Sequence, residues 1–261
     1  MDSVSVFLAD WQVLFREGIH FTLSGEEDID VIGEATSNEE ALDFIEKNIP
    51  AIAVLNANNS EFTGISLTRR IRRSLPSVSV ILIMDQEDEE ILFSAMKCGA
   101  SACITKNINP EEMVSLIRKI AGNENPISET LLRPEIAPRV LEEFEYSSSL
   151  SQQMDNLLCD LSGSENEILH GIAGGDSLEK IAGTLGISQD AVRHHLDAIL
   201  AKLVGNDRDR ELIETAQKNL PAINSGSRPG NKEMQYVSRK EFEAFKENIK
   251  ERFKALINEL S

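Results

Sequence analysis

Cysteine is scarce in this sequence, with only three residues in 261. Cys98, Cys103 and Cys159 are odd in number and form no CxxC pair, which argues against a disulfide framework and against a zinc site. We expect three buried, small apolar side chains in a reducing compartment, the cytoplasm.

Long apolar runs are also missing. No stretch reaches the length of about 18 apolar residues that a membrane-spanning helix needs. The start, MDSVSVFLAD, lacks the basic residues and the long apolar region of a signal peptide. The chain shows no nucleophile–base set, phosphate loop or metal cluster. We therefore expect no membrane partner, no enzymatic activity and no cofactor.

Basic residues are outnumbered, 26 to 44, which gives a net charge of −18. Residues 1–121 carry 10 basic and 20 acidic side chains, and residues 217–261 carry 9 and 6, or +3. The regions between them are acidic as well, at −6 for 122–160 and −5 for 161–216. Such a balance argues against a general nucleic-acid coat protein but not against a small DNA-reading element.

Apolar runs alternate with helical patterns over residues 1–121. We expect strands at 4–9, 29–35, 52–56, 78–84 and 101–105. We expect helices at 13–24, 38–48, 64–74, 87–98 and 110–121. The spacing from Ser37 to Glu40 and the pair Asn109-Pro110 mark helix starts. The alternation predicts an α/β doubly wound domain with a five-stranded parallel sheet.

The remaining chain changes character. Residues 122–160 are a predicted linker around one short helix, 134–144, because prolines and a serine run interrupt the pattern. Residues 161–220 are helical throughout, with turns at Gly174-Gly175 and Gly186. A second linker, 221–237, precedes one amphipathic helix over 238–261.

Three segments of the first domain resemble the receiver domain of bacterial response regulators. They are LADWQVLFREGI (8–19), the strand ending at Asn56 with Gly64 eight residues on, and CGASACITKNINPEE (98–112). The resemblance implies a CheY-like fold over residues 4–121. It also implies a phosphate-accepting aspartate after the third strand, acidic Mg²⁺ ligands after the first, and a hydroxyl and a lysine that bind phosphoryl oxygens.

The sequence departs from that family at most of these positions. Asn56 holds the acceptor position, and an amide cannot form an acyl phosphate. Trp11 replaces an acidic ligand, Met84 the hydroxyl and Cys103 an aromatic residue, whereas Asp10 and Lys106 match. We predict a pseudo-receiver that is not phosphorylated in the usual way. Asp10 and Lys106 then form a residual ion pair, or a pocket lined by Trp11 and Met84 binds an apolar small molecule.

The stretch LSGSENEILHGIAGGDSLEKIAGTLGISQDAVRHHLDAILAKL (161–203) resembles the four-helix DNA-binding domain of LuxR/NarL-type regulators. The resemblance implies a helix-turn-helix whose second helix enters the major groove of double-stranded DNA, and a fourth helix at 207–219. Apolar residues at helical spacing predict the core face of these helices. The predicted DNA-binding residues are Lys180, Ser188, Gln189, Asp190, Arg193, His194, His195, Asp197 and Lys202.

The charged residues of this set have opposite expected effects on DNA binding. Arg193 suits guanine, and Lys202 and Lys180 suit phosphates, whereas Asp190 and Asp197 repel phosphate. The fold then either reads DNA or persists as a protein-interaction adaptor with vestigial DNA binding. The adjacent pair His194-His195 does not suit a metal ion, because neighbouring helical residues do not face one ligand.

The C-terminal segment carries an apolar stripe that must be covered. Its members are Phe242, Phe245, Ile249, Phe253, Leu256 and Leu260. Either two chains pair through this stripe, or it folds back on its own chain, or it binds a sensor protein or RNA polymerase. The receiver resemblance offers a second dimer face, on the fourth helix and the fifth strand and helix. We expect a homodimeric transcription regulator that acts without aspartyl phosphorylation.

Overall fold

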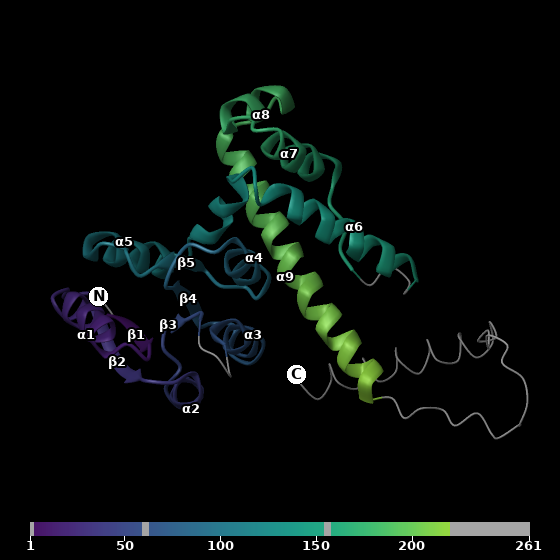
Figure 1. The fold of residues 1–261 in the computed structure, drawn as a ribbon. Coiled ribbons are helices and arrows are strands. Elements are labelled where there is room, and N and C mark those ends of the chain that lie inside the picture. Colours follow the sequence, from purple (N-terminus) through teal and green to yellow (C-terminus); the bar gives the residue numbers. More distant parts are fainter. Residues whose placement is uncertain (1–2, 59–62, 154–157, 220–261) are drawn as a thin grey trace, which may run out of the picture.

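The structure is a computed structural model that describes residues 3–58, 63–153 and 158–219. In this part of the chain, a layered α/β domain is followed by a connecting region and a group of helices (Figure 1). The predicted linker at 221–237 and the predicted amphipathic helix at 238–261 lie outside the described residues.

The first domain is built on a fully parallel sheet with the spatial order β2-β1-β3-β4-β5. Its strands are β1 (Val4–Ala9), β2 (Ile29–Ala35), β3 (Ile52–Asn56), β4 (Ser79–Met84) and β5 (Ala102–Thr105). All residues of the central strand β3 are buried, because helices cover both faces of the sheet. The strand order reverses between β1 and β3, so a crevice is expected at their carboxyl ends.

Helices form a layer on each side of this sheet. They are α1 (Val13–Ser24), α2 (Asn38–Asn48), α3 (Gly64–Ser74), α4 (Glu89–Lys97) and α5 (Pro110–Ala121). One apolar cluster joins α1 and α5 to one face of the sheet, and another joins α2, α3 and α4 to the opposite face. This layering confirms the predicted doubly wound fold.

The predicted boundaries hold to within two residues. The side chain of Ser37 accepts a hydrogen bond from the backbone N–H of Glu40, and that of Asn109 from Glu112, as the cap signals indicated. The fourth helix begins at Glu89 rather than at residue 87, because Asp88 caps it by accepting from two backbone N–H groups.

The connecting region differs from its prediction. A 3-10 helix η1 (Pro126–Leu132) precedes α6 (Ala137–Gln153), which is longer than the short helix expected at 134–144. Apolar side chains from residues 127–144 are buried in the cluster that also holds α2, α3 and α4, among them Ile127, Leu131, Ile136, Val140 and Phe144. The last three recur every four residues, and this stripe outweighs the prolines and serines that suggested a linker.

The second domain contains α7 (Gly163–Ala173), α8 (Leu178–Leu185) and α9 (Gln189–Asn219). The capping box of Ser162 and Glu165 is present as predicted. Gly186 ends α8 in a left-handed conformation with φ of 67°, which sets the tight turn before α9.

The prediction of a separate fourth helix at 207–219 is wrong. The structure has one helix of 31 residues from Gln189 to Asn219. Asn206 accepts from the backbone N–H of Cys159 and donates to its carbonyl oxygen, at 2.8 Å each. Asp207 accepts from Arg69 of α3 at 2.9 Å. The sequence Gly-Asn-Asp at 205–207 favours the end of a helix, but these contacts keep it in helical conformation.

The cysteine prediction holds in part. Cys98 is buried and Cys103 is partly buried, whereas Cys159 is exposed, so the expectation of three buried thiols is wrong for Cys159. None of the helices in the described ranges combines the length and apolar character that a membrane crossing needs.

Candidate functional site

The carboxyl edge of the sheet gathers the predicted phosphorylation-site residues. Asp10 follows β1, Asn56 ends β3, Met84 ends β4 and Lys106 follows β5. Parallel strands place their carboxyl ends at one edge, so these four positions meet although they lie far apart in the sequence. Asp10 and Asn56 are buried, with 5% and 2% of their surface exposed.

Asn56, Asp10 and Lys106 form one hydrogen-bonded network. Asn56 Nδ2 donates to Asp10 Oδ2 at 2.7 Å, and Lys106 Nζ lies 3.1 Å from the same oxygen. The other Asp10 oxygen accepts from the backbone N–H of Gln12 at 2.7 Å, and Asn56 Oδ1 accepts from that of Asn58 at 2.8 Å. The predicted ion pair of Asp10 and Lys106 is thus present, and the amide of Asn56 links it to β3.

The three remaining substituted positions lie in different surroundings. Met84 is buried in the apolar cluster beneath α3 and α4. Trp11 is 54% exposed, and Lys106 Nζ lies 5.6 Å from the centroid of its ring. Burial raises the pKa of the Cys103 thiol to about 12, so this thiol stays protonated at neutral pH.

A magnesium ion does not fit these residues. Mg²⁺ needs several free oxygen ligands, whereas both Asp10 oxygens already accept hydrogen bonds. One of those hydrogen-bond donors is the amide of Asn56, which stands at the position where the family resemblance implies the phosphate-accepting aspartate. Across the described ranges, no group of three His, Cys, Asp or Glu residues is arranged to hold a metal ion.

Two acidic residues of this edge were missed by sequence reasoning. Asp85, directly after β4, places Oδ1 2.7 Å from Lys106 Nζ, so the lysine lies between two carboxylates. Glu34 of β2 accepts from Arg16 Nε at 2.7 Å, and Arg16 in turn donates to the carbonyl oxygen of Asp10. The position of Asp85 in the sequence could have indicated it, because Asp85 directly follows a predicted strand, as Asp10 and Lys106 do.

The helix-turn-helix has the core that the sequence predicted. Ser188 accepts from the backbone N–H of Ala191 at 3.1 Å and so caps α9. Five apolar residues on one side of α9 are at most 2% exposed: Val192, Leu196, Ile199, Leu200 and Leu203. Of the predicted DNA-binding residues, those that remain on the outer sides of α9 fall into two groups.

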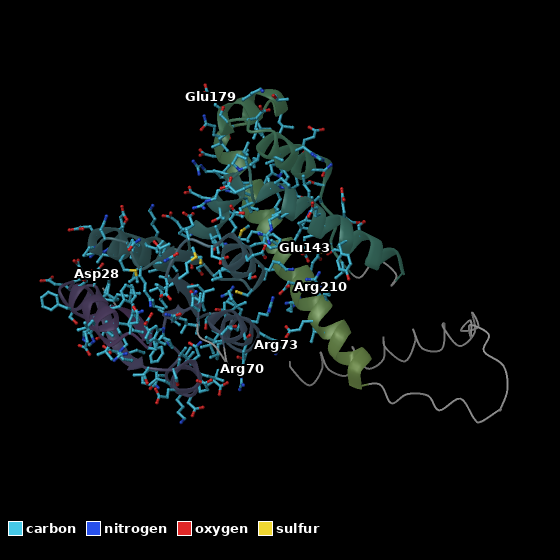
Figure 2. All side chains as sticks on the ribbon, viewed as in Figure 1. Asp28, Arg70, Arg73, Glu143, Glu179 and Arg210 are labelled. Atoms are coloured by element: carbon cyan, nitrogen blue, oxygen red, sulfur yellow. The ribbon has the colours of Figure 1, made fainter. Side chains whose placement is uncertain are left out.

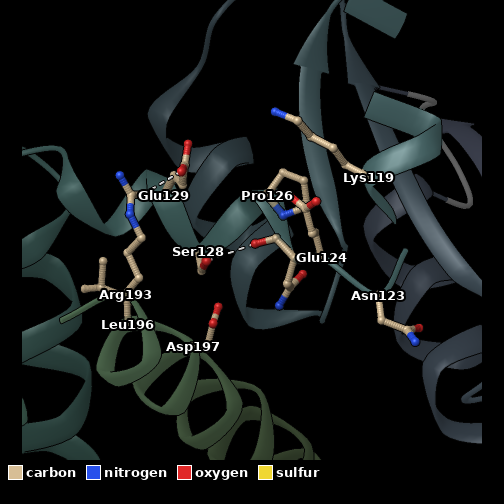
Figure 3. A pocket seen from close by; sticks show the side chains of 10 residues that line it. Lys119, Asn123, Glu124, Pro126, Ser128, Glu129, Arg193, Leu196 and Asp197 are labelled. Atoms are coloured by element: carbon tan, nitrogen blue, oxygen red, sulfur yellow. Dashed lines mark hydrogen bonds and ion pairs between the residues drawn. The ribbon is translucent and has the colours of Figure 1, made fainter. Parts of the chain in front are cut away.

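One group faces the connecting region. Arg193 Nη1 donates to Glu129 Oε1 of η1 at 2.7 Å, and Figure 3 shows the two side chains directed toward each other. Arg193 and Asp197 line a cavity of about 520 Å³ together with Lys119 and residues 123–129. The side of α9 predicted to read base edges therefore lies across from the receiver's α5 and η1.

The other group faces away from that cavity. Ser188, Asp190, His194 and His195 line an open hollow on α9, and His194 Nδ1 lies 2.7 Å from the Asp190 carbonyl oxygen. Gln189, at the first position of α9, is exposed.

The two lysines predicted to contact phosphate are engaged in ion pairs. Lys180 Nζ lies 2.5 Å from Asp176 Oδ1, on the exposed surface of α8. Lys202 donates to Glu165 at 2.6 Å and to the Asp160 carbonyl oxygen at 3.1 Å. Burial raises the pKa of Glu165, but the hydrogen bonds from Lys202 and Ser162 and the charge of Lys202 together outweigh it, so this pKa lies below its ordinary value. Lys202 thus stabilises the helical domain.

A charge cluster fixes α9 against the receiver. Asp207, 7% exposed at its side chain, lies 2.9 Å from Arg69 of α3, 3.5 Å from Lys97 of α4 and 3.4 Å from Arg210. Glu143 of α6 lies 2.9 Å from Lys97 and 2.6 Å from Arg210. Figure 2 shows Glu143 and Arg210 at the junction of α6 and α9. We call these five residues the interdomain clamp.

Two family models match the two domains that the structure separates. The response regulator receiver domain matches residues 6–118, and the luxR family of bacterial regulatory proteins matches residues 160–213. The first match covers β1 to α5 and the second covers the three helices of the second domain.

Similar proteins align with this chain over most of their length. The uncharacterized transcriptional regulatory protein YhcZ of Bacillus subtilis is 29% identical over 217 residues, 83% of this chain and 97% of that protein. The response regulator protein VraR of Staphylococcus saprophyticus is 26% identical over 217 residues, 83% of this chain and 98% of that one.

A solved structure of a two-component response regulator of the LuxR family, from Aurantimonas sp. SI85-9A1, is 24% identical. It covers 48% of this chain and 89% of that chain, with a TM-score of 0.45. Taken with the fold, the two family matches show that the chain is a LuxR-type response regulator, a DNA-binding transcriptional regulator.

Proposed function

We propose that this regulator acts as a homodimer whose receiver works without aspartyl phosphorylation. The observation that carries the proposal is the contact of 2.7 Å between Asn56 Nδ2 and Asp10 Oδ2. The donor is an amide, which is too weak a nucleophile to form an acyl phosphate. Its nitrogen engages Asp10 Oδ2, an oxygen that could otherwise serve as a metal ligand.

Local charge supports the same proposal. Lys106 carries one positive charge and lies between the carboxylates of Asp10 and Asp85, at 3.1 and 2.7 Å. A phosphoryl group would bring a further charge of about −2 into this edge. Lys106 is already shared by two carboxylates, so a further negative charge beside them is strongly disfavoured. The lysine that binds phosphate in the family is here satisfied by residues of its own chain.

We propose that the arrangement described above is a resting state. Arg193 cannot contact a guanine while it pairs with Glu129 at 2.7 Å, and Asp197 lies beside the same cavity. DNA reading through α9 requires this helix to move away from η1 and α5. Protein level, a partner such as a sensor protein, or RNA polymerase would bias that movement, and the cytoplasm is the expected compartment.

One alternative has a specific observation in its favour. An interaction adaptor with vestigial DNA binding is supported by Lys180 and Lys202, both engaged with carboxylates, and by the acidic Asp190 and Asp197 on α9. The other alternative, a ligand-sensing regulator with a pocket lined by Trp11 and Met84, loses support. Met84 is buried in the core, whereas Trp11 faces solvent.

Acyl-phosphate treatment tests phosphorylation independence. The full chain is incubated with acetyl phosphate and Mg²⁺, and intact mass is measured before and after hydroxylamine. We expect no hydroxylamine-sensitive adduct and an unchanged affinity for DNA. The matched positive control carries Trp11→Asp, Asn56→Asp and Met84→Thr together, which restores the missing chemistry. An adduct on residues 6–118 of the unmodified sequence would contradict the proposal.

A gel shift separates the regulator from the adaptor. The DNA is the region upstream of the protein's own gene, compared with unrelated DNA of equal length at about 100 mM salt. We expect a selective shift of the upstream DNA. Equal binding to both DNAs, or none, would favour the adaptor.

A further inference from the structure

The receiver concentrates arginine on one helix. The sequence Thr-Arg-Arg-Ile-Arg-Arg at 68–73 places Arg69, Arg70, Arg72 and Arg73 within one stretch of α3. Such a basic stretch is unusual in a chain whose net charge is −18. Of the four side chains, only Arg69 belongs to the interdomain clamp, so the other three need a separate explanation.

A hollow lies where α3 faces α9. Its volume is about 340 Å³, which is within the range of binding sites for small ligands. Five basic side chains line it, namely Arg69, Arg72 and Arg73 of α3, Lys97 of α4 and Arg208 of α9. Two acidic side chains of α9 line it as well, Asp207 and Glu211. The charged side chains of the lining thus carry a net charge of +3, opposite in sign to that of the whole chain.

The hollow already holds one anionic group of the chain's own. The side chain of Asp207 is only 7% exposed, and its carboxylate lies 2.9 Å from Arg69 and 3.5 Å from Lys97. Arg210 of α9 lies 3.4 Å from the same carboxylate. An anion at this junction is therefore stabilised by cations from both the receiver and α9.

The outer cations of the hollow have weaker partners. Arg73 Nη1 lies 4.0 Å from Glu211 Oε2, beyond hydrogen-bonding distance, and Figure 2 shows Arg73 between α3 and α9. Arg208 pairs with its neighbour Asp209 at 3.1 Å, and 60% of the Arg208 side chain is exposed. Exposed pairs contribute little to stability, because solvent screens them. Both guanidinium groups can therefore exchange these partners for an anion of higher charge.

Arg72 is held in a fixed position at the same junction. Its Nη1 donates to the carbonyl oxygens of Pro76 and Val78 at 2.8 and 3.2 Å. A Cβ atom placed on Gly99 would lie 3.6 Å from Arg72 Nε and 3.3 Å from a methyl group of Val204 on α9. Among the described residues, the hydrogen-bond partners of Arg72 are uncharged, so its positive charge is left for a ligand.

We propose that this hollow binds a small anion with a diphosphate group, and that the anion joins α3 to α9. Guanidinium groups hold phosphate oxygens through parallel hydrogen bonds, so arginines from two helices suit a ligand with several such oxygens. One phosphate group carries a charge of about −2, so a ligand with two such groups is needed to offset the +3 of the lining. Inorganic pyrophosphate and a nucleotide diphosphate share this chemistry.

The bound anion biases the position of α9. It contacts Arg73 on α3 and Arg208 on α9 at once, and so adds a link between the receiver and α9 beside the interdomain clamp. This link opposes the movement of α9 that DNA reading requires. The effect on DNA rests on the resting state of the proposed function, whereas the binding site does not. The receiver then responds to phosphate that is bound rather than covalently attached.

Isothermal titration calorimetry of the full chain with inorganic pyrophosphate tests the site, without Mg²⁺ and at constant ionic strength. We expect one saturable site per chain. Inorganic phosphate should bind about tenfold more weakly, because it offers fewer oxygens and less charge. Arg73→Gln and Arg208→Gln should each raise the dissociation constant of pyrophosphate about fivefold or more. An absence of saturable binding of pyrophosphate would overturn the proposal.

Arg70→Gln is the matched control. Arg70 lies on the same helix, and its side chain is 52% exposed against 47% for Arg73, but it pairs with Glu46 and does not line the hollow. The variant removes the same charge from α3 and should leave the dissociation constant unchanged. An equal loss of binding in Arg70→Gln and Arg73→Gln would overturn the site, because the general field of α3 would then explain the effect.

Gel shifts separate the small anion from DNA as the source of the phosphate groups. At equal ionic strength, pyrophosphate should lower the DNA affinity of the original chain and have less effect on Arg208→Gln. If Arg73→Gln and Arg208→Gln weaken DNA binding without pyrophosphate, the hollow contacts the phosphates of DNA, and the proposal is overturned. Pyrophosphate that binds as expected but leaves DNA affinity unchanged supports the anion site and contradicts the resting state of the proposed function.

Discussion

The receiver pocket and the helix α9 differ in how their predicted functional residues are engaged. At the pocket, Asn56 stands where the family resemblance implies the acceptor aspartate, and its side chain hydrogen-bonds to Asp10 and to the backbone of Asn58. On α9, Arg193, which we propose as a reading residue, donates to Glu129. The pocket therefore differs from the family in the type of residue at a fixed position, whereas α9 has the predicted type of residue in contact with another part of its own chain.

This difference follows from what holds each site together. The sheet edge is fixed by buried strands on both sides of β3, so a side chain at the strand end can change without moving the backbone. The position of α9 depends instead on contacts with other elements, namely ion pairs to α3, α4, α6 and η1 and an apolar cluster shared with them. The pair of Arg193 and Glu129 is exposed on both side chains, and exposed ion pairs are weak and screened by salt, so the contact of α9 with η1 is the adjustable one.

The largest expected effect is on the reading residue. Arg193→Ala should lower affinity for the selective DNA site by about 1–3 kcal/mol, the value of a bidentate contact to guanine. The matched variant Glu129→Gln removes only the partner of Arg193, so it should leave affinity equal or raise it slightly. Gel shifts with both variants measure these affinities. If the two variants weaken DNA binding equally, Arg193 acts through η1 and not at the base edge.

The next effect concerns the pocket. Asn56→Asp places a second buried carboxylate at 2.7 Å from Asp10, and like charges at that distance raise the pKa of the new group. The free energy of unfolding should fall by about 2 kcal/mol at pH 8. The loss should shrink as the pH falls through the raised pKa, because the protonated form restores a hydrogen bond.

Denaturant unfolding at several pH values measures this effect, with Asn58→Asp as the control in an exposed position. Mg²⁺ should stabilise Asn56→Asp and have no effect on the original chain, since only the variant offers two carboxylates. A pH-independent loss would mean that the pocket is open to water, contrary to the burial of Asn56.

The prediction from sequence was most accurate where residues of one strand or helix decide the outcome. The strand ends, the caps at Ser37 and Asn109 and the core face of α9 depend on local spacing, and the structure confirms them. The continuity of α9 depends on contacts of Asn206 and Asp207 with residues far away in the sequence. Nothing near these residues indicates those partners, so tertiary contacts overrode a local break signal.

The pocket illustrates the same limit within one site. Asp10, Asn56 and Lys106 could be placed by their motif positions, and their contacts follow from the sheet. Asp85 is not part of the motif, and only the fold shows that its carboxylate lies 2.7 Å from Lys106. In the same way, the orientation of Arg193 on α9 was predictable, but the presence of Glu129 opposite it was not.

A smaller effect is expected at the interdomain clamp. Burial raises the pKa of Glu143, but the hydrogen bond and charge of Lys97 and the charge of Arg210 outweigh it, so this pKa lies below the ordinary 4.5. A lowered pKa means that the stability from Glu143 is present above pH 4.5 and is lost as the pH falls through the folded value. At pH 7, Glu143→Gln should cost about 1–2 kcal/mol.

Thermal unfolding across pH checks the sign. The difference between the original chain and Glu143→Gln should be largest near neutrality and vanish in acid. The neighbouring exposed residue supplies a control, Glu142→Gln, which should show no difference at any pH. If the difference in stability between the original chain and Glu143→Gln grows as the pH falls, Glu143 stabilises the protein through packing and not through its charge.

The smallest effect is expected at Asp85, and it sharpens the contrast between the two ends. Asp85 is 40% exposed at its side chain, so its pair with Lys106 is screened and Asp85→Asn should cost less than about 1 kcal/mol. Asp10, 5% exposed, retains the lysine. Lys106→Met should cost more, because it leaves the buried Asp10 carboxylate without a cation. Denaturant unfolding measures both variants. If Asp85→Asn lowers the free energy of unfolding as much as Lys106→Met does, then both carboxylates stabilise the lysine. Asp85 would then be the partner of Lys106 that the phosphoryl group is in the family.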